Sequence, residues 1–503
     1  MLDRPDSLAA RAQGQGGGAA PGRPRAARGP FRPEVWLNAR QRSSVRLSAH
    51  YFRLIDVLAV IGVTLAAMLG LRPSEASHGL TAAEAAPLAA GALSALTLLR
   101  GFQLYRFARD TFWPLHLAGV AACGLVAGGA ALLTGLALGA EAPGRVGLWT
   151  AANGAYLLGL HGAWLGLIAR WRRQGALSPN IVVVGATRHA QTLIEQALDR
   201  RDMNVLGVFD DRLARAPQSV AGVPVLGDAS ALTTHRIMPY VDRIVLAIDP
   251  EAGQRVRDLT QRLQTLPNPL TVLVDSELGG DGVLNRLANA PLAALDGPAD
   301  PDRRAFNKRL QDLLIGALLL AVAAPIMALI ALAVRLDSPG PVFFRQRRHG
   351  FNHETIVVWK FRSMRHEAAD ATASRQVCPG DDRVTRVGRF IRATSLDELP
   401  QLFNVLSGEM SLVGPRPHAI GMKTGETESA LLVAEYAHRC RIKPGMTGWA
   451  AVKGSRGPVD TEAQVRKRVQ LDIEYVERQS FWLDLWIMLI TVPVLLGDRA
   501  AVR

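Results

Sequence analysis

The stretch "LLIGALLLAVAAPIMALIALAV", residues Leu313 to Val334, decides on which side of a membrane the C-terminal part of the chain lies. The run is long enough to cross about 30 Å of hydrocarbon as a helix. Basic residues flank it on both sides, with Lys308 and Arg309 before it and Arg335 after it, so the charge rule places neither end outside. Pro325 removes a backbone donor near the middle and kinks the helix. We therefore expect a re-entrant helix over about residues 313–334, with the chain cytoplasmic at both ends.

Working toward the N-terminus, four apolar segments are each long enough to span a bilayer. Arginines crowd the N-terminal tail, the loop after the second segment and the exit after the fourth, whereas the other two loops are poor in them. This asymmetry places the N-terminus and everything after residue 170 in the cytoplasm. A basic tail rich in Gly, Pro and Ala, residues 1–48, is expected to be disordered. The four transmembrane helices are expected within residues 49–172, at Leu54–Leu71, Leu80–Leu99, Phe112–Ala140 and Gly147–Ala169.

Between the fourth span and the re-entrant segment, short apolar runs alternate with helical stretches, which is typical of a parallel α/β sheet. We expect a Rossmann-like cytoplasmic domain over residues 178–297. Its first turn keeps only Gly185 of the G-x-G-x-x-G fingerprint, although Asp210 and Asp211 stand near the position of a ribose-binding acid. The broken fingerprint favours a structural or oligomerising role over a bound dinucleotide. The expected strands are "NIVVVGA", "NVLGVFDD", "VPVLGD", "RIVLAID" and "LTVLVD".

Working toward the C-terminus, "FWLDLWIMLITVPVLL", about residues 481–496, is short for a span. It contains Asp484, together with Trp482 and Trp486, and tryptophan prefers the headgroup layer. We expect an interfacial helix that holds residues 303–503, the C-terminal domain, flat against lipid. A substrate with a polar head and an apolar tail would present itself there.

Composition limits the other classes of partner and site. The 503 residues carry a net charge of +14, which asks for an anionic partner. The basic residues cluster at membrane exits and around one acidic pair, so a nucleic acid is not the expected partner. Three cysteines that form no CxxC pair indicate neither a disulfide framework nor a zinc site. The two histidines of "HGFNH", residues 349–353, have Gly350 between them and are interpreted as loop residues.

The acidic pair is Asp397 and Glu398, within "RFIRATSLDELPQLFNVLSGEMSLVGPRP", Arg389 to Pro417. With Asp397 as the N-cap of a helix, Pro400 falls in the tolerated first turn. Asp397 would then lie at the positive end of the helix dipole and stay ionised. The plainer alternative makes Asp397 only a helix cap and Glu398 only a solvated acid.

Arginines surround this pair. Arg383, Arg386, Arg389 and Arg392 precede it, and Arg416 follows in "GPRP", where Pro415 and Pro417 fix the backbone. Planar guanidinium donors beside carboxylates suit phosphate together with a divalent metal. For the four earlier arginines, a basic solvated face remains the competing interpretation.

The run from Lys308 to Leu496 resembles the catalytic domain of the monotopic bacterial polyprenyl-phosphate sugar phosphotransferases. The spans and the Rossmann-like domain ahead of it resemble the large form of that family, so the likeness covers about residues 50–503. The implied fold is a membrane α/β protein with a four-helix transmembrane bundle, a Rossmann-like domain and a mostly α monotopic catalytic domain. The motifs that carry the resemblance are "KRLQD", the proline-containing apolar segment, "SPGPVFFRQRRHG", "VWKFRSM", the stretch around the acidic pair and "IKPGMTGWAAV".

The resemblance implies transfer of a hexose 1-phosphate, with glucose or galactose as the sugar, from a UDP-sugar to undecaprenyl phosphate. UMP is released, and the reaction starts exopolysaccharide, capsule or O-antigen synthesis at the inner membrane of a bacterium. Asp397 matches the nucleophile that forms a covalent phosphosugar, and Glu398 matches its partner in metal and proton handling, with Mg²⁺ as cofactor. The resemblance leaves the oligomeric state open, with a homodimer as one option. The substrate-binding candidates are Arg392, Arg416, Lys360, Arg362 and Arg386.

One departure from the family concerns the sugar. Ala451 and Lys453 stand where the family commonly has glutamine and asparagine. This change keeps open a catalytically altered scaffold of polysaccharide assembly. A membrane-bound sugar-nucleotide dehydratase is the other alternative, but Tyr436 and Tyr475 both lack the lysine four positions later that such an enzyme needs.

Overall fold

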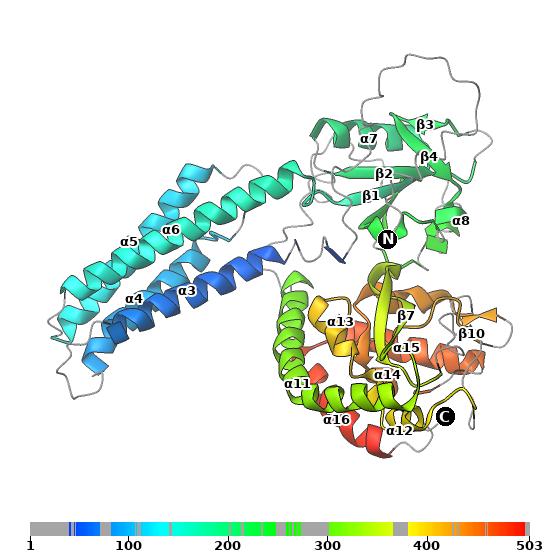
Figure 1. The fold of residues 1–503 in the computed structure, drawn as a ribbon. Helices are drawn as coiled ribbons and strands as arrows, with labels where there is room; N and C mark the ends of the chain where they lie inside the picture. Colours follow the sequence, from blue (N-terminus) through cyan, green and yellow to red (C-terminus); the bar gives the residue numbers. More distant parts are fainter. Residues whose placement is uncertain are drawn as a thin grey trace, which may run out of the picture.

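The chain was studied as a computed structural model. Three parts follow one another along the sequence, namely a helical bundle, a domain built on a parallel sheet, and a mostly helical C-terminal domain (Figure 1). Residues 1–39 of the expected tail, 273–297 of the Rossmann-like domain and 498–503 lie outside the described residues. The structure describes residues 40–41, 45, 47–70, 82–105, 107, 112–139, 143–200, 203–212, 216–232, 235–247, 258–260, 262–263, 266–268, 270–272, 301–365, 381–424, 427–429, 432–457, 459 and 461–497.

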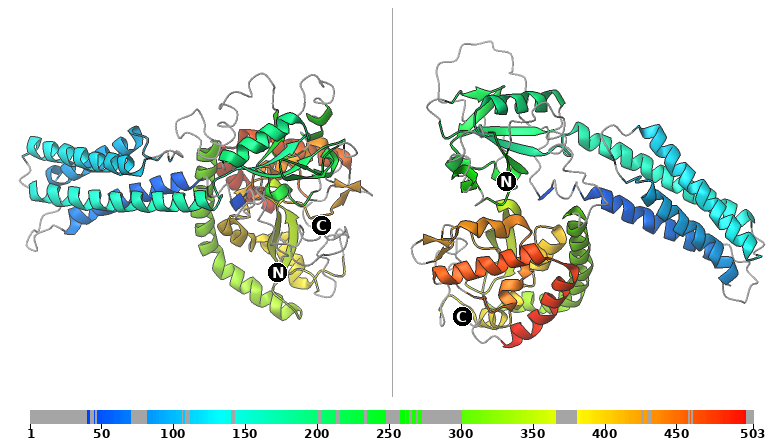
Figure 2. Two further views of the ribbon diagram at one scale, coloured as in Figure 1. Left: turned by 90° about the horizontal axis from the view of Figure 1, so that it is seen from above. Right: turned by 180° about the vertical axis from the view of Figure 1, so that it is seen from behind.

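The bundle consists of α3 (Ser48–Gly70), α4 (Ala82–Gly101), α5 (Trp113–Ala137) and α6 (Pro143–Arg173), packed side by side (Figures 1 and 2). The first three are long and apolar enough to cross a membrane. α6, at the fourth predicted span, does not share this property, and its crossing stays a prediction. Among the described residues, the fourth helix with this property is α11 (Pro301–Asp337).

Polar side chains inside the bundle explain the weaker hydropathy of α6. His161 of α6 is fully buried, with Nε2 3.1 Å from Asp56 Oδ2 and Nδ1 2.9 Å from His116 Nε2. Trp149 Nε1, also from α6, donates to Thr64 Oγ1 at 3.0 Å. Polar groups in lipid must find partners within the protein. The polar face of α6 therefore points into the bundle, toward α3 and α5.

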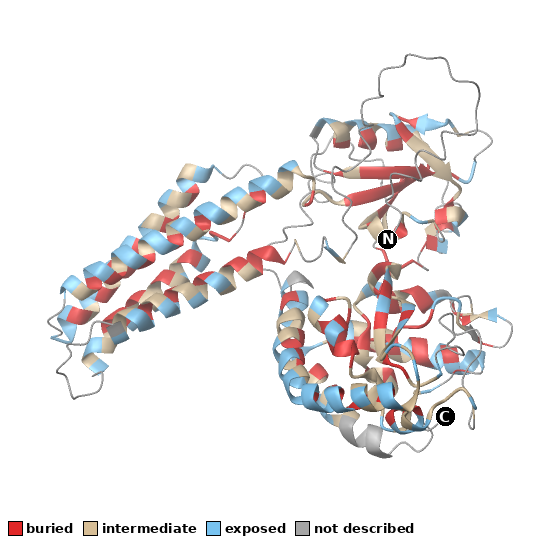
Figure 3. Ribbon diagram, viewed as in Figure 1, coloured by how far each residue is buried: buried red, intermediate tan, exposed pale blue. Residues whose placement is uncertain are grey.

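The sheet of the second part has the order β3-β4-β2-β1-β5-β6. Except for β3, which pairs antiparallel with β4, the strands are parallel. Each of the five expected runs contains a strand, whereas no sequence pattern predicted the two-residue β3. Buried apolar side chains cover both faces of the sheet, which Figure 3 shows as red strands. The strands are β1 (Asn180–Val184), β2 (Asn204–Phe209), β3 (Ser219–Val220), β4 (Val223–Gly227), β5 (Arg243–Leu246) and β6 (Leu270–Val272), accompanied by α7 (Arg188–Arg200), α8 (Ala229–Leu232) and the 3₁₀ helix η1 (Met238–Tyr240).

The two acids near the expected ribose position bind the main chain. Asp210 Oδ2 accepts a hydrogen bond from the amide of Ala186 at 2.6 Å, in the turn after β1. Asp211 Oδ1 accepts one from the amide of Ala229 at 2.9 Å, at the start of α8. Both carboxylates therefore have a structural use within this domain.

The C-terminal domain has a main apolar core that includes Met327 and Ile330 of α11 and Val405 of α13, and a smaller apolar cluster that includes Val433 and Val465. The antiparallel β7–β8 hairpin and the short parallel pair of β9 and β12 lie against these helices. Its elements are α11, β7 (Phe343–His349), η4 (Phe351–His353), β8 (Thr355–Phe361), α12 (Arg386–Ala393), η6 (Leu396–Glu398), α13 (Gln401–Ser407), β9 (Ser411–Val413), β10 (Lys423–Thr424), β11 (Thr427–Glu428), η8 (Ala434–Arg441), β12 (Gly445–Thr447), α14 (Trp449–Val452), α15 (Glu462–Arg478) and α16 (Phe481–Gly497).

Helix α11 is longer than expected, with 37 residues, and its ribbon is bent (Figures 1 and 2). Pro325 lies inside it, and a proline inside a helix is a common cause of bending because it removes a hydrogen bond to the preceding turn. One face carries exposed apolar side chains such as Leu318 and Leu329, whereas Met327 and Val334 are buried in the core. An apolar face of this kind is suited to lipid.

The "KRLQD" motif at the start of α11 ties three elements together. Arg309 donates to the main-chain oxygens of Val405 and Leu406, at 2.6 and 2.7 Å, and so binds carbonyls at the end of α13. Asp312 accepts from the amide of Leu412 in β9 at 3.0 Å. Lys308 lies 2.7 Å from Asp484 of α16. Since Asp484 faces inward, Trp482 and Leu489 of the same helix stay exposed.

Candidate active site

The acidic pair lies in a tight turn that differs from the expected helix start. Leu396 to Glu398 form the 3₁₀ helix η6, and α13 begins later with Pro400 at its N-cap position. Asp397 is therefore not the N-cap of α13, because the chain makes a separate turn ahead of it. Ser395, just before η6, has a φ of 57°, which is uncommon for a residue other than glycine. Arg456 Nη2 donates to the Ser395 hydroxyl at 2.6 Å and holds this turn.

Two cations bind Glu398. Lys360 of β8 donates to Glu398 Oε1 at 2.8 Å. Arg416 donates to both carboxylate oxygens, through Nη1 to Oε2 at 3.1 Å and through Nη2 to Oε1. The side chains of Lys360 and Glu398 are less than one-fifth exposed, whereas that of Arg416 is 44% exposed. The guanidinium of Arg416 thus reaches solvent while it holds the acid.

The pKa values of the two carboxyl groups shift in opposite directions. Burial alone would raise the pKa of Glu398, but Arg416 and Lys360 hold it well below its ordinary value. Burial raises the pKa of Asp397; the charge of Glu398 adds to this rise, and Lys360, Arg392 and Arg416 oppose it. Neighbouring acids whose pKa values are shifted in opposite directions are typical of sites where one acid reacts and the other supports it.

Three glycines fix the loop that carries Arg416. A Cβ on Gly414 would lie 2.5 Å from the main-chain oxygen of Lys443, and one on Gly445 would lie 2.0 Å from the amide nitrogen of Gly414. A Cβ on Gly448 would lie 2.3 Å from the oxygen of Gly414. The "GPRP" and "PGMTG" segments therefore cross in direct backbone contact. Pro415 and Pro417, both buried, bracket Arg416 at this crossing as expected.

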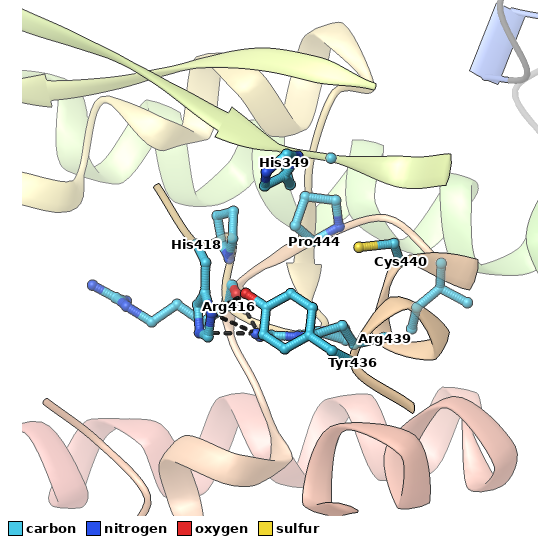
Figure 4. Close-up of a pocket in the computed structure, with 11 residues that line it drawn as sticks. His349, Arg416, His418, Tyr436, Arg439, Cys440 and Pro444 are labelled. Carbon is cyan, nitrogen blue, oxygen red and sulfur yellow. Dashed lines mark hydrogen bonds between the residues drawn. The ribbon is translucent and has the colours of Figure 1, made fainter. Parts of the chain in front are cut away.

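A buried polar network lies behind Arg416. Arg439 Nη2 donates to the main-chain oxygen of Arg416 at 2.7 Å and lies 2.7 Å from Asp472. His418 contacts Arg439 at 2.8 Å and Tyr436 at 2.5 Å. Figure 4 shows His418, Tyr436 and Arg439 beside Arg416, where they line a small pocket with other residues that include His349, Cys440 and Pro444. Burial and the charges of nearby arginines lower the pKa of His418 well below its usual value.

The arginines expected to bind substrate divide into two groups. Arg392, in the last turn of α12, contributes charge at Asp397 together with Lys360 and Arg416. Arg386 is exposed in the first turn of α12, and its role stays a prediction. The expectation for Arg362 needs correction. Its buried guanidinium donates to the main-chain oxygens of Val334, Ser338 and Pro339, at 3.2, 2.6 and 2.7 Å, and binds the C-terminal end of α11.

The segment that departs from the family lies around α14. Lys453 Nζ stands 4.6 Å from the centre of the Trp449 ring, within the range of a cation–π contact. Trp449 Nε1 donates to Glu474 at 3.0 Å. Arg456, which binds Ser395, follows in the same loop. The altered residues are thus joined through a short piece of chain to the turn of the acidic pair.

Arg439, His418 and Arg456 are the residues that sequence reasoning missed. Their roles depend on side-chain contacts between residues 18 to 61 positions apart, such as His418 with Tyr436 and Arg456 with Ser395. Neither spacing nor composition marks them, because each is a single polar residue with no repeated pattern around it. The only signal was their place near quoted motifs, since His418 follows "GPRP" and Arg439 and Arg456 flank "IKPGMTGWAAV".

Comparison with known proteins finds two family matches in this chain. Residues 303–498 match the family described as "Bacterial sugar transferase". Residues 115–272 match one described as "CoA-binding domain". The first match contains the acidic pair and both cations that bind Glu398, so the site described above lies within the transferase domain.

Three relatives extend the match. A UDP-glucose:undecaprenyl-phosphate glucose-1-phosphate transferase of Xanthomonas campestris pv. campestris is 37% identical over 71% of this chain and 75% of its own length. A protein of the same name from Escherichia coli K12 is 35% identical over 64% of this chain and 69% of its own. The "Exopolysaccharide production protein PSS" of Rhizobium leguminosarum bv. phaseoli is 47% identical over 37% of this chain and 92% of its own. The chain therefore belongs to the bacterial sugar transferase family.

Proposed function

We propose that the protein transfers glucose 1-phosphate from UDP-glucose to undecaprenyl phosphate, releases UMP and so starts the synthesis of an exopolysaccharide. The observation that carries this proposal is the pair of Asp397 and Glu398, held among Lys360, Arg392 and Arg416. Such a cluster suits a reaction between two phosphate-bearing substrates. Glucose, rather than galactose, is favoured by the names of the two relatives that share most of this chain.

The reaction is proposed to proceed in two displacements. A carboxylate oxygen of Asp397 attacks the phosphorus that bears the sugar, a new O–P bond forms, and the bond to the UMP oxygen breaks with its electron pair on UMP. An oxygen of undecaprenyl phosphate then attacks the same phosphorus and releases Asp397. Burial of Asp397 favours this role, because a carboxylate removed from water is a stronger nucleophile, while Lys360, Arg392 and Arg416 oppose the rise of its pKa.

The cations around the acidic pair have different roles. Arg416 is the partly exposed one, and its planar guanidinium suits the phosphate oxygens on which charge develops. Glu398, whose pKa the two cations hold well below its ordinary value, binds Arg416 and Lys360 and keeps them in place. Arg392, which precedes Asp397 in the sequence, adds positive charge near its carboxylate.

The acidic pair also fits a magnesium ion. Magnesium binds through one or two carboxylates and completes its shell with substrate phosphates and water, and the pair supplies two carboxylates and no third acid within the described residues. Asp397 and Glu398 would hold the ion, and when bound it would offset charge on the phosphates. Since both oxygens of Glu398 already accept hydrogen bonds, Asp397 is the more accessible ligand.

We further propose that α11 is re-entrant and that the catalytic domain lies on the cytoplasmic face of the inner membrane. Arg309, near the start of α11, binds α13, and Asp337, at its end, accepts from the amide of Val387 in α12 at 3.0 Å. Both ends of the helix thus contact the same domain. Its length and apolar composition would suffice for a span, but a spanning helix would separate these two contacts by the thickness of the bilayer.

The direct test uses purified protein in nanodiscs with undecaprenyl phosphate, Mg²⁺ and a panel of UDP-sugars. UMP release and formation of a lipid-linked diphosphate sugar are measured. Turnover with UDP-glucose, exceeding that with UDP-galactose, is the expected result. If only another UDP-sugar is turned over, the proposed sugar is wrong. If no donor gives a lipid-linked product, the proposed function is wrong.

A further inference from the structure

The β7–β8 hairpin joins the acidic pair to the rest of the protein. We propose that its turn, residues 349–354, docks on the Rossmann-like domain and thereby positions Lys360 and Arg416, with Asn352 as the positioning residue. This inference rests on the proposed function, because it concerns the same site. Figure 1 shows the hairpin reaching from the C-terminal domain toward the Rossmann-like domain.

The first step is the contact at the turn. Asn352 is buried, and its Nδ2 donates to the main-chain oxygens of Met238 at 3.2 Å and Val241 at 3.1 Å. These two carbonyls belong to the Rossmann-like domain, at η1 and just after it. Val241 is held in turn by Asn268 Nδ2 at 2.7 Å. The Asn352 amide therefore binds a fixed part of the neighbouring domain.

The backbone of the turn suits this docking. Asn352 has a φ of 51° and His353 a φ of 58°, so two successive residues are left-handed. Asparagine tolerates this conformation better than most residues. The turn is closed by the amide of Gly350, which donates to the oxygen of Glu354 at 2.7 Å. The conformation aims the Asn352 side chain outward at the Rossmann-like domain.

A second contact reaches the same turn from the N-terminal side. Arg40, ahead of the helical bundle, donates to both oxygens of Glu354, through Nε at 3.1 Å and through Nη2 at 3.2 Å. Both side chains are mostly buried, with 19% and 14% exposed. The hairpin turn is thus contacted both by the Rossmann-like domain and by the segment that precedes the helical bundle.

The two strands of the hairpin connect its turn to the acidic pair. The strands pair without interruption from His349 opposite Thr355 to Phe343 opposite Phe361. On β8, Lys360 donates to Glu398. On β7, the amide of His349 donates to the oxygen of His418 at 3.2 Å, and Arg348 Nη1 donates to the oxygen of Pro417 at 2.5 Å.

Both cations of Glu398 therefore depend on one hairpin. Lys360 belongs to it, and Arg416 precedes a segment that two residues of β7 bind. A shift of the hairpin at its turn moves both cations relative to Asp397, and small displacements of this kind are costly in the transition state. Losing the turn contact should thus lower kcat more than it raises KM, since no substrate contact is removed.

The test compares full-length variants in nanodiscs. Asn352→Gly keeps the left-handed backbone and removes the amide, whereas Asn352→Asp keeps the size but turns a carboxylate toward two carbonyl oxygens. The control is Gln103→Gly, at an exposed left-handed position in the helical bundle. Steady-state kcat and KM for UDP-glucose are measured per folded protein. Hydrogen exchange is followed by mass spectrometry in residues 343–349 and 416–419.

For both Asn352 variants we expect kcat to fall about three- to ten-fold with KM changed less than about two-fold. Exchange at residues 343–349 and 416–419 should be faster, and the control should match the wild type in all measurements. Variants that yield less folded protein with unchanged kcat and unchanged exchange would reduce Asn352 to a stabilising residue and overturn the proposal. If the wild type transfers no sugar phosphate, the proposed function fails, whereas the exchange data still decide whether the turn controls the strands of the hairpin.

Discussion

Lys360 donates a 2.8 Å hydrogen bond to Glu398, and this contact brings a strand of the hairpin onto the turn of the acidic pair. Arg416 binds the same carboxylate. Glu398 therefore acts as the anchor of two cations, and Asp397 beside it has the raised pKa. The two acids have different environments although they are adjacent in the sequence.

The first prediction concerns the nucleophile. With UDP-glucose alone, the wild type should release about one UMP per active site before lipid is added, because the covalent step needs only the first substrate. Mass spectrometry should find a phosphosugar on the peptide that contains Asp397. Asp397→Asn should abolish both signals, since an amide keeps the shape but loses the charge. Near-normal turnover of Asp397→Asn with the correct lipid product would refute the assignment.

The second prediction uses the pH dependence of kcat/KM. Because the folded-state pKa of Asp397 is raised, the charged nucleophile is lost as pH falls through a value above the usual ~3.9. Lys360 lowers this pKa, so Lys360→Met should move the acid limb of the profile to higher pH. Glu398 raises it, so Glu398→Gln should move the limb to lower pH, although both variants will be slower. Shifts in the same direction would contradict the described charge balance.

The third prediction concerns topology. In a protein without its native cysteines, Ala305→Cys places a single thiol near the start of α11 and Pro341→Cys places one just after its end. Both should react with a membrane-impermeant maleimide only in inside-out vesicles, because both ends of a re-entrant helix lie in the cytoplasm. Pro325→Ala restores a backbone donor and should favour a straighter, spanning helix. Labelling of either thiol in right-side-out vesicles would refute re-entry for the wild type.

The fourth prediction tests the backbone crossing that carries Arg416. Gly445→Ala places a methyl group 2.0 Å from the amide nitrogen of Gly414, so it should destabilise the domain by more than the ~1–3 kcal/mol of ordinary overpacking. Gly316→Ala, whose new methyl meets Val405 at 3.4 Å, is the matched control and should fold normally. Thermal unfolding in detergent measures both. An unchanged melting temperature for Gly445→Ala would mean that the two segments can separate.

The fifth prediction separates Arg362 from the substrate. Arg362→Ala removes several charge-assisted hydrogen bonds to the end of α11 and should destabilise the protein by about 2–4 kcal/mol. KM for UDP-glucose should stay within about two-fold of the wild type for the folded fraction. Arg416→Lys provides the contrast, since it keeps charge but loses the two-pronged contact and should raise KM. A large rise in KM for Arg362→Ala would restore its role in binding.

The sequence predicted those features that depend on local pattern. Apolar runs between polar turns located all five parallel strands, and the long apolar segments located α3, α4, α5 and α11. The fourth predicted span, Gly147–Ala169, falls within α6, whose polar residues such as His161 find partners inside the bundle. The acidic pair was recognisable because its chemistry is concentrated in a short stretch.

The features that sequence reasoning missed depend on distant partners. Arg362 was a substrate-binding candidate because its motif "VWKFRSM" resembles the family, and a motif does not show whether an arginine binds phosphate or the end of a helix. The structure shows which carbonyls it meets. Asp397 was expected at a helix start because Pro400 is compatible with one, but the left-handed Ser395 and its bond to Arg456 stabilise a separate turn.

The bent shape of α11 has a mechanical consequence for the bilayer. On the re-entrant arrangement, the helix and its exposed leucines occupy area in the inner leaflet and none in the outer one. The protein then acts as a wedge, and the work of inserting it depends on the lateral pressure of that leaflet. Lipids with small headgroups, which crowd the acyl region and leave space at the surface, would change how deeply Asp397 sits relative to the phosphate of its lipid acceptor.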